Sequence, residues 1–335
     1  MKRVGRMMMG FILMGIFLAG VPPTVPAEKV KYNLGWIPYG LHAGFFGALG
    51  EGYYKKYGLD VEWQRGFGAG DTAKRVAVGQ FQLGRSDVSN AALGRARGLG
   101  LKSIAQFVTL SPHAILTFKG SGIRHPKDLN GRTVSTAPGA IIDQTFPVFA
   151  KKWGIKVGKW IYVEPRGMNA TLLSGKSEAL LAFGIYHKIV NRLAKKMGKE
   201  VRIMWWSDYG FEMLGESLVT TDKLIREKPD LLRRFVRATF EGVAWSIEHP
   251  AEAAGHLEKA VPTSKAAIEV HQWKVTIGRI LAPGILKNGL GHHDFKRVEL
   301  TRDLAFEINK IQKKIPVEAI ATNGFLPPKP ILPKK

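Results

Sequence analysis

The sequence predicts an α/β fold of two lobes, in which each lobe is a mixed sheet flanked by helices. Length is the first observation, because 335 residues are more than one compact lobe usually contains. The stretch 33–63 is the second: an apolar strand, a tight turn, a helix and another strand follow one another, as at the start of a doubly wound sheet. Residues 132–206 repeat this pattern. Ligands in such sheets lie where strand ends face helix N-termini, so the turns are candidate site walls.

Residues 1–27 resemble a secretory signal peptide. Three basic residues precede an apolar run from 7 to 18, and Val25-Pro26-Ala27 offers a small-x-small cleavage site. We therefore expect cleavage near Ala27 and a periplasmic mature protein. The alternative is an uncleaved anchor, but a membrane span needs about 20 apolar residues and this run is shorter.

Composition excludes several classes of site. The chain has no cysteine, which excludes disulfides, thiolate metal sites, a lipid attachment site and a cysteine nucleophile. The formal net charge is +23, and removing Lys2, Arg3 and Arg6 leaves +20, a charge that favours anionic ligands and surfaces. The basic residues are scattered, and no helix-turn-helix, RNP or zinc-finger pattern occurs. We therefore expect no nucleic acid partner.

The turn from Trp36 to His42 is the first candidate wall of the binding site. It follows an apolar strand predicted over 33–37, and a helix is expected to begin near Leu41. The turn therefore lies at a strand end and beside a helix N-terminus. Trp36, Tyr39 and His42 are its candidate ligand-binding residues.

The glycine-rich loop after the second strand is a further candidate. Gly66 and Gly68 begin what looks like a dinucleotide fingerprint, but Asp71 stands where the third glycine is required. We expect this backbone to approach a small ligand, with Asp71 contributing to the site and capping a helix over 72–78. The next strand, 81–84, leads into a polar turn that caps another helix.

Three turns of the second half add candidates. The strand 132–135 runs into a turn that contains Thr136, Pro138 and Gly139 and precedes a helix to about residue 153. The N-terminus of that helix offers backbone N–H groups to an anion. The other candidates, after the strands 160–164 and 179–183, are Glu164, Arg166 and Tyr186.

Two other motifs carry no function. Gly175-Lys176-Ser177 ends a helix, and Walker spacing would require a glycine where Ala170 stands, so it is not a phosphate-binding loop. His292-His293-Asp294 is the tightest group of potential metal ligands, but adjacent residues point apart and we expect no metal site there. We also expect no cofactor and no catalytic residue.

The C-terminal third predicts two long amphipathic helices that pack onto the first lobe. The first ends before Pro250 and the second at Pro316. Their expected buried faces are Leu232, Phe235, Val236, Val243 and Ile247 in the first, and Leu300, Leu304, Ile308, Ile311 and Ile315 in the second.

Several segments carry a family resemblance over nearly the whole mature chain. Trp36-x-Pro38, Ala43-Gly44-Phe45-Phe46 and Gly58-Leu59-Asp60-Val61 resemble the opening of the NMT1/THI5-like periplasmic solute-binding proteins. The segment 123–134 resembles their I-x-x-P-x-D-L-x-G-K-x-V motif, and 208–235 resembles a later Y-G and P-x-L-x-R-x-F region. The group includes nitrate, taurine, alkanesulfonate and pyrimidine-precursor binders of ABC importers.

The resemblance implies a type II periplasmic binding fold with two crossover hinge strands, near 111–114 and 217–220. Lobe I would comprise residues 28–112 and 217–335, and lobe II residues 113–216. It also implies that the polar turn after 81–84 contributes to the ligand wall. Ser86, Asn90 and, before the return crossover, Asp208 become candidate ligand-binding residues on this ground.

The implied function is that of a monomeric receptor, not an enzyme, that delivers a small solute to an ABC permease and its ATPase. Two alternatives remain. One is a pyrimidine-synthesis enzyme like the fungal relatives, which use a cysteine-rich iron motif that this chain lacks. The other is a sensor that reports solute to a membrane receptor, and only a neighbouring permease gene would separate it from a transport protein.

The sequence favours an anionic solute. Pyrimidine-precursor binders typically place a carboxylate just after an aromatic residue in the segment that here reads Phe183-Gly184-Ile185-Tyr186-His187-Lys188, and this chain has no acid there. We expect a small organic carboxylate or sulfonate whose apolar body stacks on Trp36, Tyr39 or Tyr186, with Arg166 reaching the cleft. The alternative is that Lys188 and Arg166 are solvated and that Glu164 neutralises Arg166.

Overall fold

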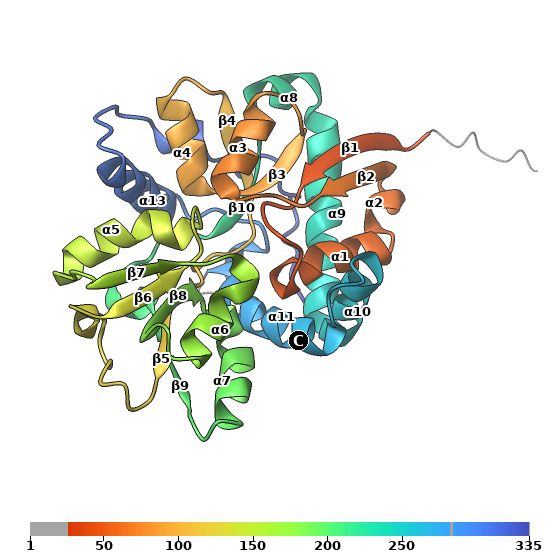
Figure 1. Ribbon diagram of the computed structural model, residues 1–335. Coiled ribbons are helices and arrows are strands. Elements are labelled where there is room, and N and C mark those ends of the chain that lie inside the picture. Colours follow the sequence, from red (N-terminus) through yellow and green to blue (C-terminus); the bar gives the residue numbers. More distant parts are fainter. Residues whose placement is uncertain (1–25, 282–283, 335) are drawn as a thin grey trace, which may run out of the picture.

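The computed structural model describes residues 26–281 and 284–334, so the expected signal peptide lies almost wholly outside the described residues. Two separate sheets form two lobes, and the second lobe is built from the middle of the chain (Figure 1). Both sheets are mixed, as the sequence predicts. No helix in the described residues combines the length and hydropathy that a bilayer crossing requires.

The first lobe contains a sheet with the strand order β2-β1-β3-β10-β4. β1 is parallel to β2 and β3, whereas β10 is antiparallel to β3 and β4. The strands are β1 (Glu28–Asn33), β2 (Leu59–Gln64), β3 (Leu83–Asp87), β4 (Leu101–Gln106) and β10 (Glu216–Thr221). The helices are η1 (Gly40–His42), α1 (Ala43–Gly50), α2 (Tyr53–Lys56), α3 (Ala69–Ala77), α4 (Val88–Ala96), α8 (Asp222–Glu227), α9 (Pro229–Glu248), α10 (Pro250–Ala260), α11 (Ala266–Ile280), α12 (Ile285–Asn288), α13 (Phe295–Ile308) and α14 (Val317–Ile320).

The second lobe repeats this plan with the strand order β7-β6-β8-β5-β9. β6 is parallel to β7 and β8, and β5 is antiparallel to β8 and β9. The strands are β5 (His113–Phe118), β6 (Thr133–Thr136), β7 (Lys159–Tyr162), β8 (Ala179–Phe183) and β9 (Val201–Trp205). The helices are η2 (Pro126–Leu129), α5 (Ile141–Trp153), η3 (Pro165–Gly167), α6 (Met168–Leu173), η4 (Gly184–Tyr186), α7 (His187–Lys195) and η5 (Trp206–Tyr209).

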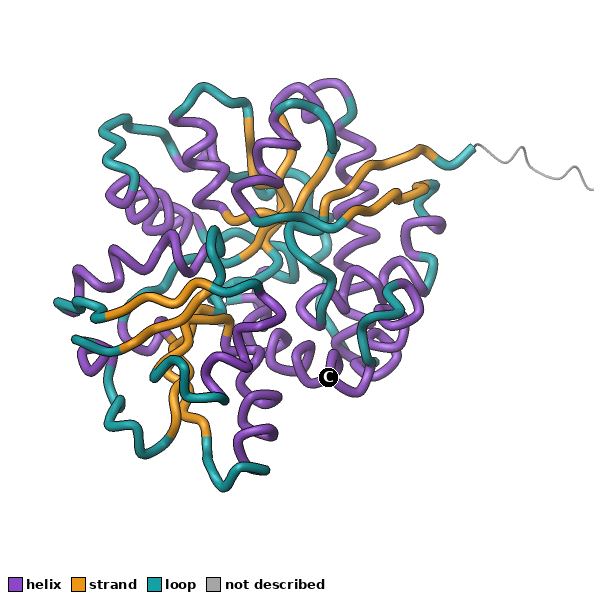
Figure 2. The backbone as a smooth tube through the Cα atoms, viewed as in Figure 1, coloured by secondary structure: helices purple, strands orange, loops and turns teal. Residues whose placement is uncertain are grey.

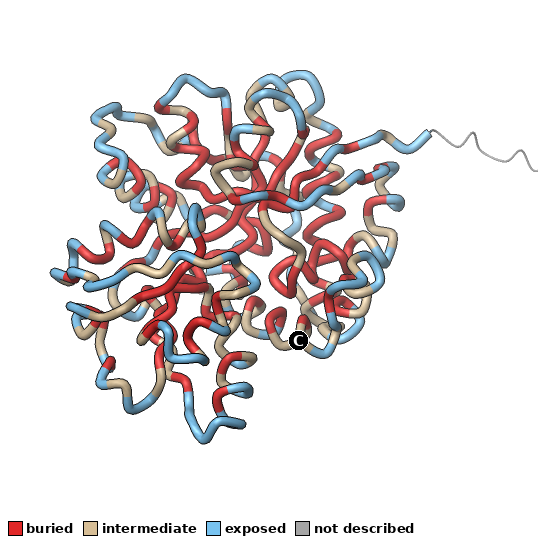
Figure 3. Tube along the Cα trace, in the orientation of Figure 1, coloured by how far each residue is buried: buried red, intermediate tan, exposed pale blue. Residues whose placement is uncertain are grey.

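Burial follows the position of each strand in its sheet. The central strands β3 and β10 are buried along almost their whole length because helices cover both faces of the sheet (Figures 2 and 3). The edge strand β2 instead alternates buried and exposed residues. The polar residues at the ends of β3 and β10 are therefore held in an interior that is otherwise apolar.

The chain passes between the lobes twice, once between β4 and β5 and once between η5 and β10. The segment 217–220, expected to be the return crossover, lies within β10 and pairs with both β3 and β4. The return crossing is therefore completed before Glu216. This placement makes β10 a central strand of the first sheet and brings Glu216 opposite Asp87 in the β3–β10 register.

The first strand ends earlier than the sequence predicts. β1 stops at Asn33, whereas an apolar strand was expected over 33–37. The Asn33 side-chain oxygen accepts hydrogen bonds from the Gly35 amide at 3.0 Å and the Thr72 hydroxyl at 2.7 Å. These bonds stabilise a turn at Asn33, so Trp36 and Ile37 belong to a loop.

Asp71 does not cap a helix, contrary to the sequence prediction. α3 begins at Ala69, after Gly68 at φ +127°, so Asp71 lies inside the first turn. There its carboxylate pairs with Arg75 one turn later, at 2.8 Å. The glycine-rich loop starts the helix three residues earlier than expected, because Gly68 adopts a conformation that few other residues tolerate.

The last long helix, α13, buries a different face from the one predicted. Val298, Thr301 and Ala305 are buried, whereas Leu300 is 40% exposed. Leu304 packs against the apolar core of the second lobe instead of the first. α13 therefore contacts both lobes, and Glu307 on it forms an exposed ion pair of 2.6 Å with Lys151 on α5 of the second lobe.

Each lobe has a closely packed core of its own. In the second lobe the buried Trp206 stacks on Phe149 with ring centroids 4.2 Å apart. In the first, α1 packs closely on α9, and a Cβ atom added at Gly242 would lie 2.2 Å from the Cβ of Ala48. Such an approach is open only to glycine.

This contact predicts opposite effects for two helical glycines. Gly242→Ala should lower the free energy of unfolding by about 2 kcal/mol because α9 must move away from α1. Gly255→Ala is the matched control: nothing lies within 4 Å of its added Cβ, so it should gain about 0.5–1 kcal/mol from helix propensity. Urea unfolding measures both, and equal effects of the two substitutions would contradict the packing argument.

Candidate ligand-binding site

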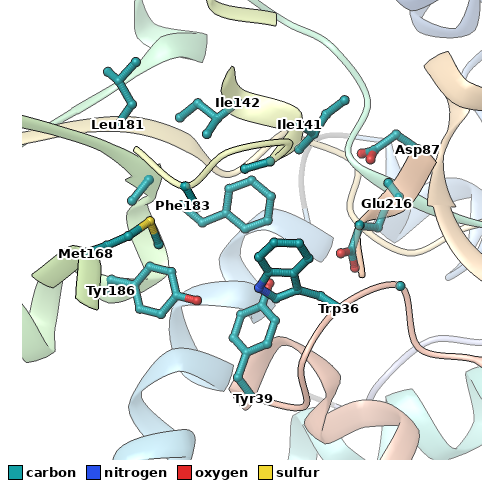
Figure 4. Close-up of a pocket in the computed structure, with 16 residues that line it drawn as sticks. Trp36, Tyr39, Asp87, Ile141, Ile142, Met168, Leu181, Phe183, Tyr186 and Glu216 are labelled. Atoms are coloured by element: carbon teal, nitrogen blue, oxygen red, sulfur yellow. The ribbon is translucent and has the colours of Figure 1, made fainter. Parts of the chain in front are cut away.

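A cavity with about 600 Å³ of empty space, part of it open to solvent, lies between the two lobes (Figure 4). Turns at strand ends supply most of its wall. Its lining from the first lobe is Gly35, Trp36, Tyr39, Gly68, Ala69, Asp87 and Glu216. Its lining from the second lobe is Ala137, Ala140, Ile141, Ile142, Met168, Leu181, Ala182, Phe183 and Tyr186.

The loop that carries Trp36 and Tyr39 is held at several points. Gly35 has φ +84°, and a Cβ there would lie 2.6 Å from the Arg85 carbonyl oxygen, so the loop lies directly on β3. The Gly40 amide donates to the side-chain oxygen of Gln272 on α11 at 2.9 Å. These contacts fix both aromatic side chains against the cavity.

His42 supports this loop from behind. Its Nε2 donates to the Leu34 carbonyl at 2.9 Å, and its ring meets the Tyr39 ring edge-on with centroids 4.9 Å apart. Burial, together with the nearby Arg85 guanidinium, holds the pKa of His42 well below its usual range. The imidazole is therefore neutral and acts as a fixed donor under Tyr39.

Aromatic and apolar side chains form the wall from the second lobe. Phe183 ends β8, Tyr186 ends η4 and Met168 begins α6. The Tyr186 ring lies nearly parallel to that of Tyr39, with centroids 6.0 Å apart and an interplanar angle of 14°. Figure 4 shows Phe183 and Trp36 facing the same space from opposite lobes. The cavity is thus suited to a flat apolar body.

Two carboxyl groups form the polar side of the cavity, beside Trp36 (Figure 4). Glu216 is buried, and its Oε2 lies 2.7 Å from Nη2 of the buried Arg85. Arg85 also stacks over the Phe107 ring at 4.4 Å and donates to the Leu41 carbonyl at 3.4 Å. Burial raises the pKa of Glu216, and the adjacent guanidinium opposes that change.

Asp87 is the second acid. Its side chain is buried, and its Oδ2 has no hydrogen-bond partner among the residues that the structure describes. Burial and the neighbouring Glu216 carboxylate raise the pKa of Asp87 to about 8, with Arg85 acting in the opposite direction. A carboxyl group with this pKa is largely protonated at neutral pH.

The structure brings three predicted site residues to the cavity: Trp36, Tyr39 and Tyr186. Two others support its wall through backbone carbonyls. The Ser86 hydroxyl donates to Ala69 at 2.8 Å, and the Thr136 hydroxyl donates to Leu181 at 3.2 Å. Neither of these hydroxyl groups is free to face a ligand in this arrangement.

The remaining candidates lie elsewhere. Asp71 and Asn90 line a separate groove bounded by α3 and α4, and Pro138 and Gly139 form an exposed turn next to the cavity. Exposed positions outside the lining hold Glu164, Arg166 and Asp208. The short strand β7 ends at Tyr162, so Glu164 and Arg166 extend to the surface.

Sequence reasoning missed most of the lining, including its two acids, Asp87 and Glu216, and the side chains of Met168 and Phe183. Asp87 lies in the polar turn that the sequence analysis noted, and Phe183 in the segment compared with pyrimidine-precursor binders, so both signals were present. Among the described lining residues there is no lysine or arginine, and Arg166 and Lys188 lie outside. The lining therefore offers no basic side chain to the anionic solute that the sequence favours, and the charge of the solute stays a prediction.

The sequence profile of the family described as "NMT1/THI5 like" matches residues 40–253, more than half of the chain. The chain belongs to the NMT1/THI5-like family. The match begins at Gly40, directly after Trp36 and Tyr39, and continues through the second lobe into α10. The family segment therefore includes the lining residues from Gly68 to Glu216, but not Gly35, Trp36 and Tyr39.

Individual relatives differ in their described activities. The chain is 26% identical to a formylaminopyrimidine-binding protein from Halalkalibacterium halodurans, over 68% of each chain. It is 23% identical to a 4-amino-5-hydroxymethyl-2-methylpyrimidine phosphate synthase from Saccharomyces cerevisiae, over 68% of this chain and 69% of the yeast protein. The fold is similar to that of the periplasmic aliphatic sulphonate-binding protein SsuA from Escherichia coli, with a TM-score of 0.64, 16% identity and coverage of 93% and 96%. The two-lobed type II periplasmic binding fold is thereby confirmed.

The buried ion pair predicts a large stability effect at Glu216. Glu216→Gln should lower the free energy of unfolding at pH 7 by about 3 kcal/mol, because it leaves the Arg85 guanidinium buried without its partner. The control is Glu200→Gln, which breaks the exposed pair with Lys119 and should leave the urea midpoint nearly unchanged. Equal shifts in the two variants would show that the Arg85 pair is solvated.

Proposed function

We propose that the protein is a periplasmic receptor that holds a small solute between its lobes and delivers it to the permease and ATPase of an ABC importer. The observation that carries this proposal is the cavity that both lobes line with aromatic side chains, Trp36 and Tyr39 from one and Phe183 and Tyr186 from the other. Pockets with an apolar lining and few polar groups are typical of small-molecule sites. The binding-protein relative and the fold it shares with SsuA support the same assignment.

The lining favours a solute with a flat ring system. Rings gain stabilisation from stacking and edge contacts with aromatic side chains in addition to the burial of their surface, by about 0.5–1.5 kcal/mol for each pair. Met168 and Ile141 add adaptable apolar surface around these rings. Together these contacts supply affinity without requiring a charge on the solute.

A receptor of this design has to open. The lobes are joined by two chain crossings and by exposed contacts such as the Lys151–Glu307 ion pair. The Arg279 side chain on α11 also lies over the Trp205 ring of the second lobe at 3.5 Å. The exposed Lys151–Glu307 pair contributes only about 0–1 kcal/mol, so it does not prevent the lobes from parting.

Two alternatives keep the same fold. The absence of cysteine argues against a synthase activity like that of the yeast relative. The family resemblance implies that the fungal enzymes use a cysteine-rich iron motif, which this chain lacks. A sensor would bind its solute in the same cavity but contact a membrane receptor instead of a permease. Co-purification with a permease, or growth that depends on a linked importer, supports the transport proposal over the sensor.

Trp36 provides the direct test of the cavity. In a panel of aromatic amines, aromatic acids, sulfonates, nitrate and aminopyrimidines, at least one compound should raise the melting temperature by mass action. Trp36→Ala should weaken the binding of that compound at least tenfold, which corresponds to a loss of about 1.4 kcal/mol of binding free energy. The control is Tyr162→Ala, an exposed aromatic outside the lining, which should bind normally. Unchanged affinity in Trp36→Ala would place binding elsewhere.

Closure is tested independently. A solute that contacts both lobes binds the closed arrangement more tightly, so saturation should shift the population toward it. Small-angle scattering should then give a smaller radius of gyration with the bound compound than without it. An unchanged radius with occupancy proved by calorimetry would contradict closure while leaving binding intact.

A further inference from the structure

The carboxyl group of Asp87 is unusual for its place in the chain. Asp87 stands at the N-cap position of α4, where an aspartate normally accepts a hydrogen bond from the first turn of the helix. Its side chain makes no such bond, although it is only 5% exposed. Instead it lines the cavity, with Oδ2 unpartnered among the described residues. A buried polar group in this state costs free energy unless something pairs with it.

The groups around Asp87 do not supply a partner. Arg85 pairs through Nη2 with Glu216 at 2.7 Å and stacks over Phe107, and its buried Nε makes no hydrogen bond with the described residues. Glu216 lies opposite Asp87 in the strand register, and two adjacent acids do not both ionise readily. The Tyr39 hydroxyl is a further titratable group near Asp87, and burial raises its pKa well above the usual value, so it stays neutral. The charges of Arg85 and Glu216 compensate each other, and Asp87 remains as an additional acid.

We propose that Asp87 binds the polar edge of the solute, and that this edge is a hydrogen-bond-accepting ring nitrogen next to an amino group. The inference rests on the proposed function, because it assigns the solute class of the same cavity. A protonated carboxyl group donates one hydrogen bond and accepts one, which matches this edge at two points. The aromatic lining then holds the ring, whereas a sulfonate or carboxylate would find no counter-ion in a lining that has no basic residue among those described.

The proton that Asp87 shares with the solute gives the binding affinity a distinctive dependence on pH. The acid and the ring nitrogen share one proton, and the bound pair is the same whether the proton lies on Asp87 or on the ring. Above the pKa of Asp87, about 8, the free protein has lost that proton and must take one up to bind. The affinity should therefore be constant near neutrality. Above the pKa of Asp87, about 8, it should fall by about tenfold for each further pH unit.

The test uses 4-aminoquinazoline, which carries the required edge, quinazoline, which lacks the amino group, and naphthalene-1-sulfonate, a flat anion. Calorimetry at pH 6–9 compares the wild type with Asp87→Leu, Asp87→Asn and the control Asp71→Asn, which lies in the separate groove. The wild type should bind 4-aminoquinazoline at least tenfold more tightly than the other two compounds. Asp87→Leu should lose this preference, and Asp71→Asn should keep it.

Asp87→Asn separates recognition from a merely structural role. A side-chain amide donates and accepts like a protonated carboxyl group but does not titrate, so this variant should keep the affinity at pH 7 within about threefold and lose the fall at high pH. Near-ultraviolet circular dichroism confirms that each variant is folded.

Three results would overturn the inference: normal binding by Asp87→Leu, an alkaline fall that persists in Asp87→Asn, or failure of 4-aminoquinazoline to bind the wild type. Tight binding of naphthalene-1-sulfonate that Trp36→Ala abolishes would also overturn it, yet would leave the receptor function standing. Failure of every solute in the wider panel would count against the receptor itself.

Discussion

Burial of the Arg85 guanidinium is the constraint on which the site depends. A charge in that position requires a counter-ion and hydrogen-bond acceptors, and it obtains them from Glu216 and from the Leu41 carbonyl. Leu41 lies in the loop of Trp36 and Tyr39, and Glu216 begins the strand that follows the return crossing. One side chain thus joins the site loop, the central strand β3 and the chain returning from the second lobe. Its own backbone carbonyl leaves room only for glycine at position 35.

Local sequence patterns predicted the strands and helices well, because each type has a characteristic spacing of apolar residues and is bounded by turn residues. They predicted less about what each face contacts. In α13 the spacing of Leu300 and Leu304 indicated one buried stripe, but the helix lies between two lobes and buries Val298 against one and Leu304 against the other. Periodicity identifies an apolar surface without identifying its partner, which depends on contacts between segments far apart in the chain.

The same limit explains the site. Asp71 and Asp87 both stand near helix starts, and sequence alone selected Asp71. What distinguishes them is tertiary: Asp71 has Arg75 one turn away, whereas Asp87 meets β10 and the cavity. The aromatic residues were easier to identify. Trp36, Tyr39 and Tyr186 lie in turns at strand or helix ends, and their large side chains form part of the cavity wall. The burial of a carboxyl group has no comparable signature in sequence.

Net charge says little about the interior of the cavity for a related reason. The basic excess of this chain is spread over exposed positions, where charges are screened within about 8–10 Å by physiological salt. The potential inside the cavity is instead determined by a few buried groups, which are screened much less. Ile141 and Phe183 of the second lobe line the same cavity as Asp87, and they would move away from it when the lobes part. It follows that opening the lobes rehydrates Asp87 and draws its pKa toward the ordinary value, which favours ionisation. The protonated form that pairs with a neutral solute is therefore most stable when the lobes are closed, and the same hinge that admits water also weakens the polar contact that holds the solute.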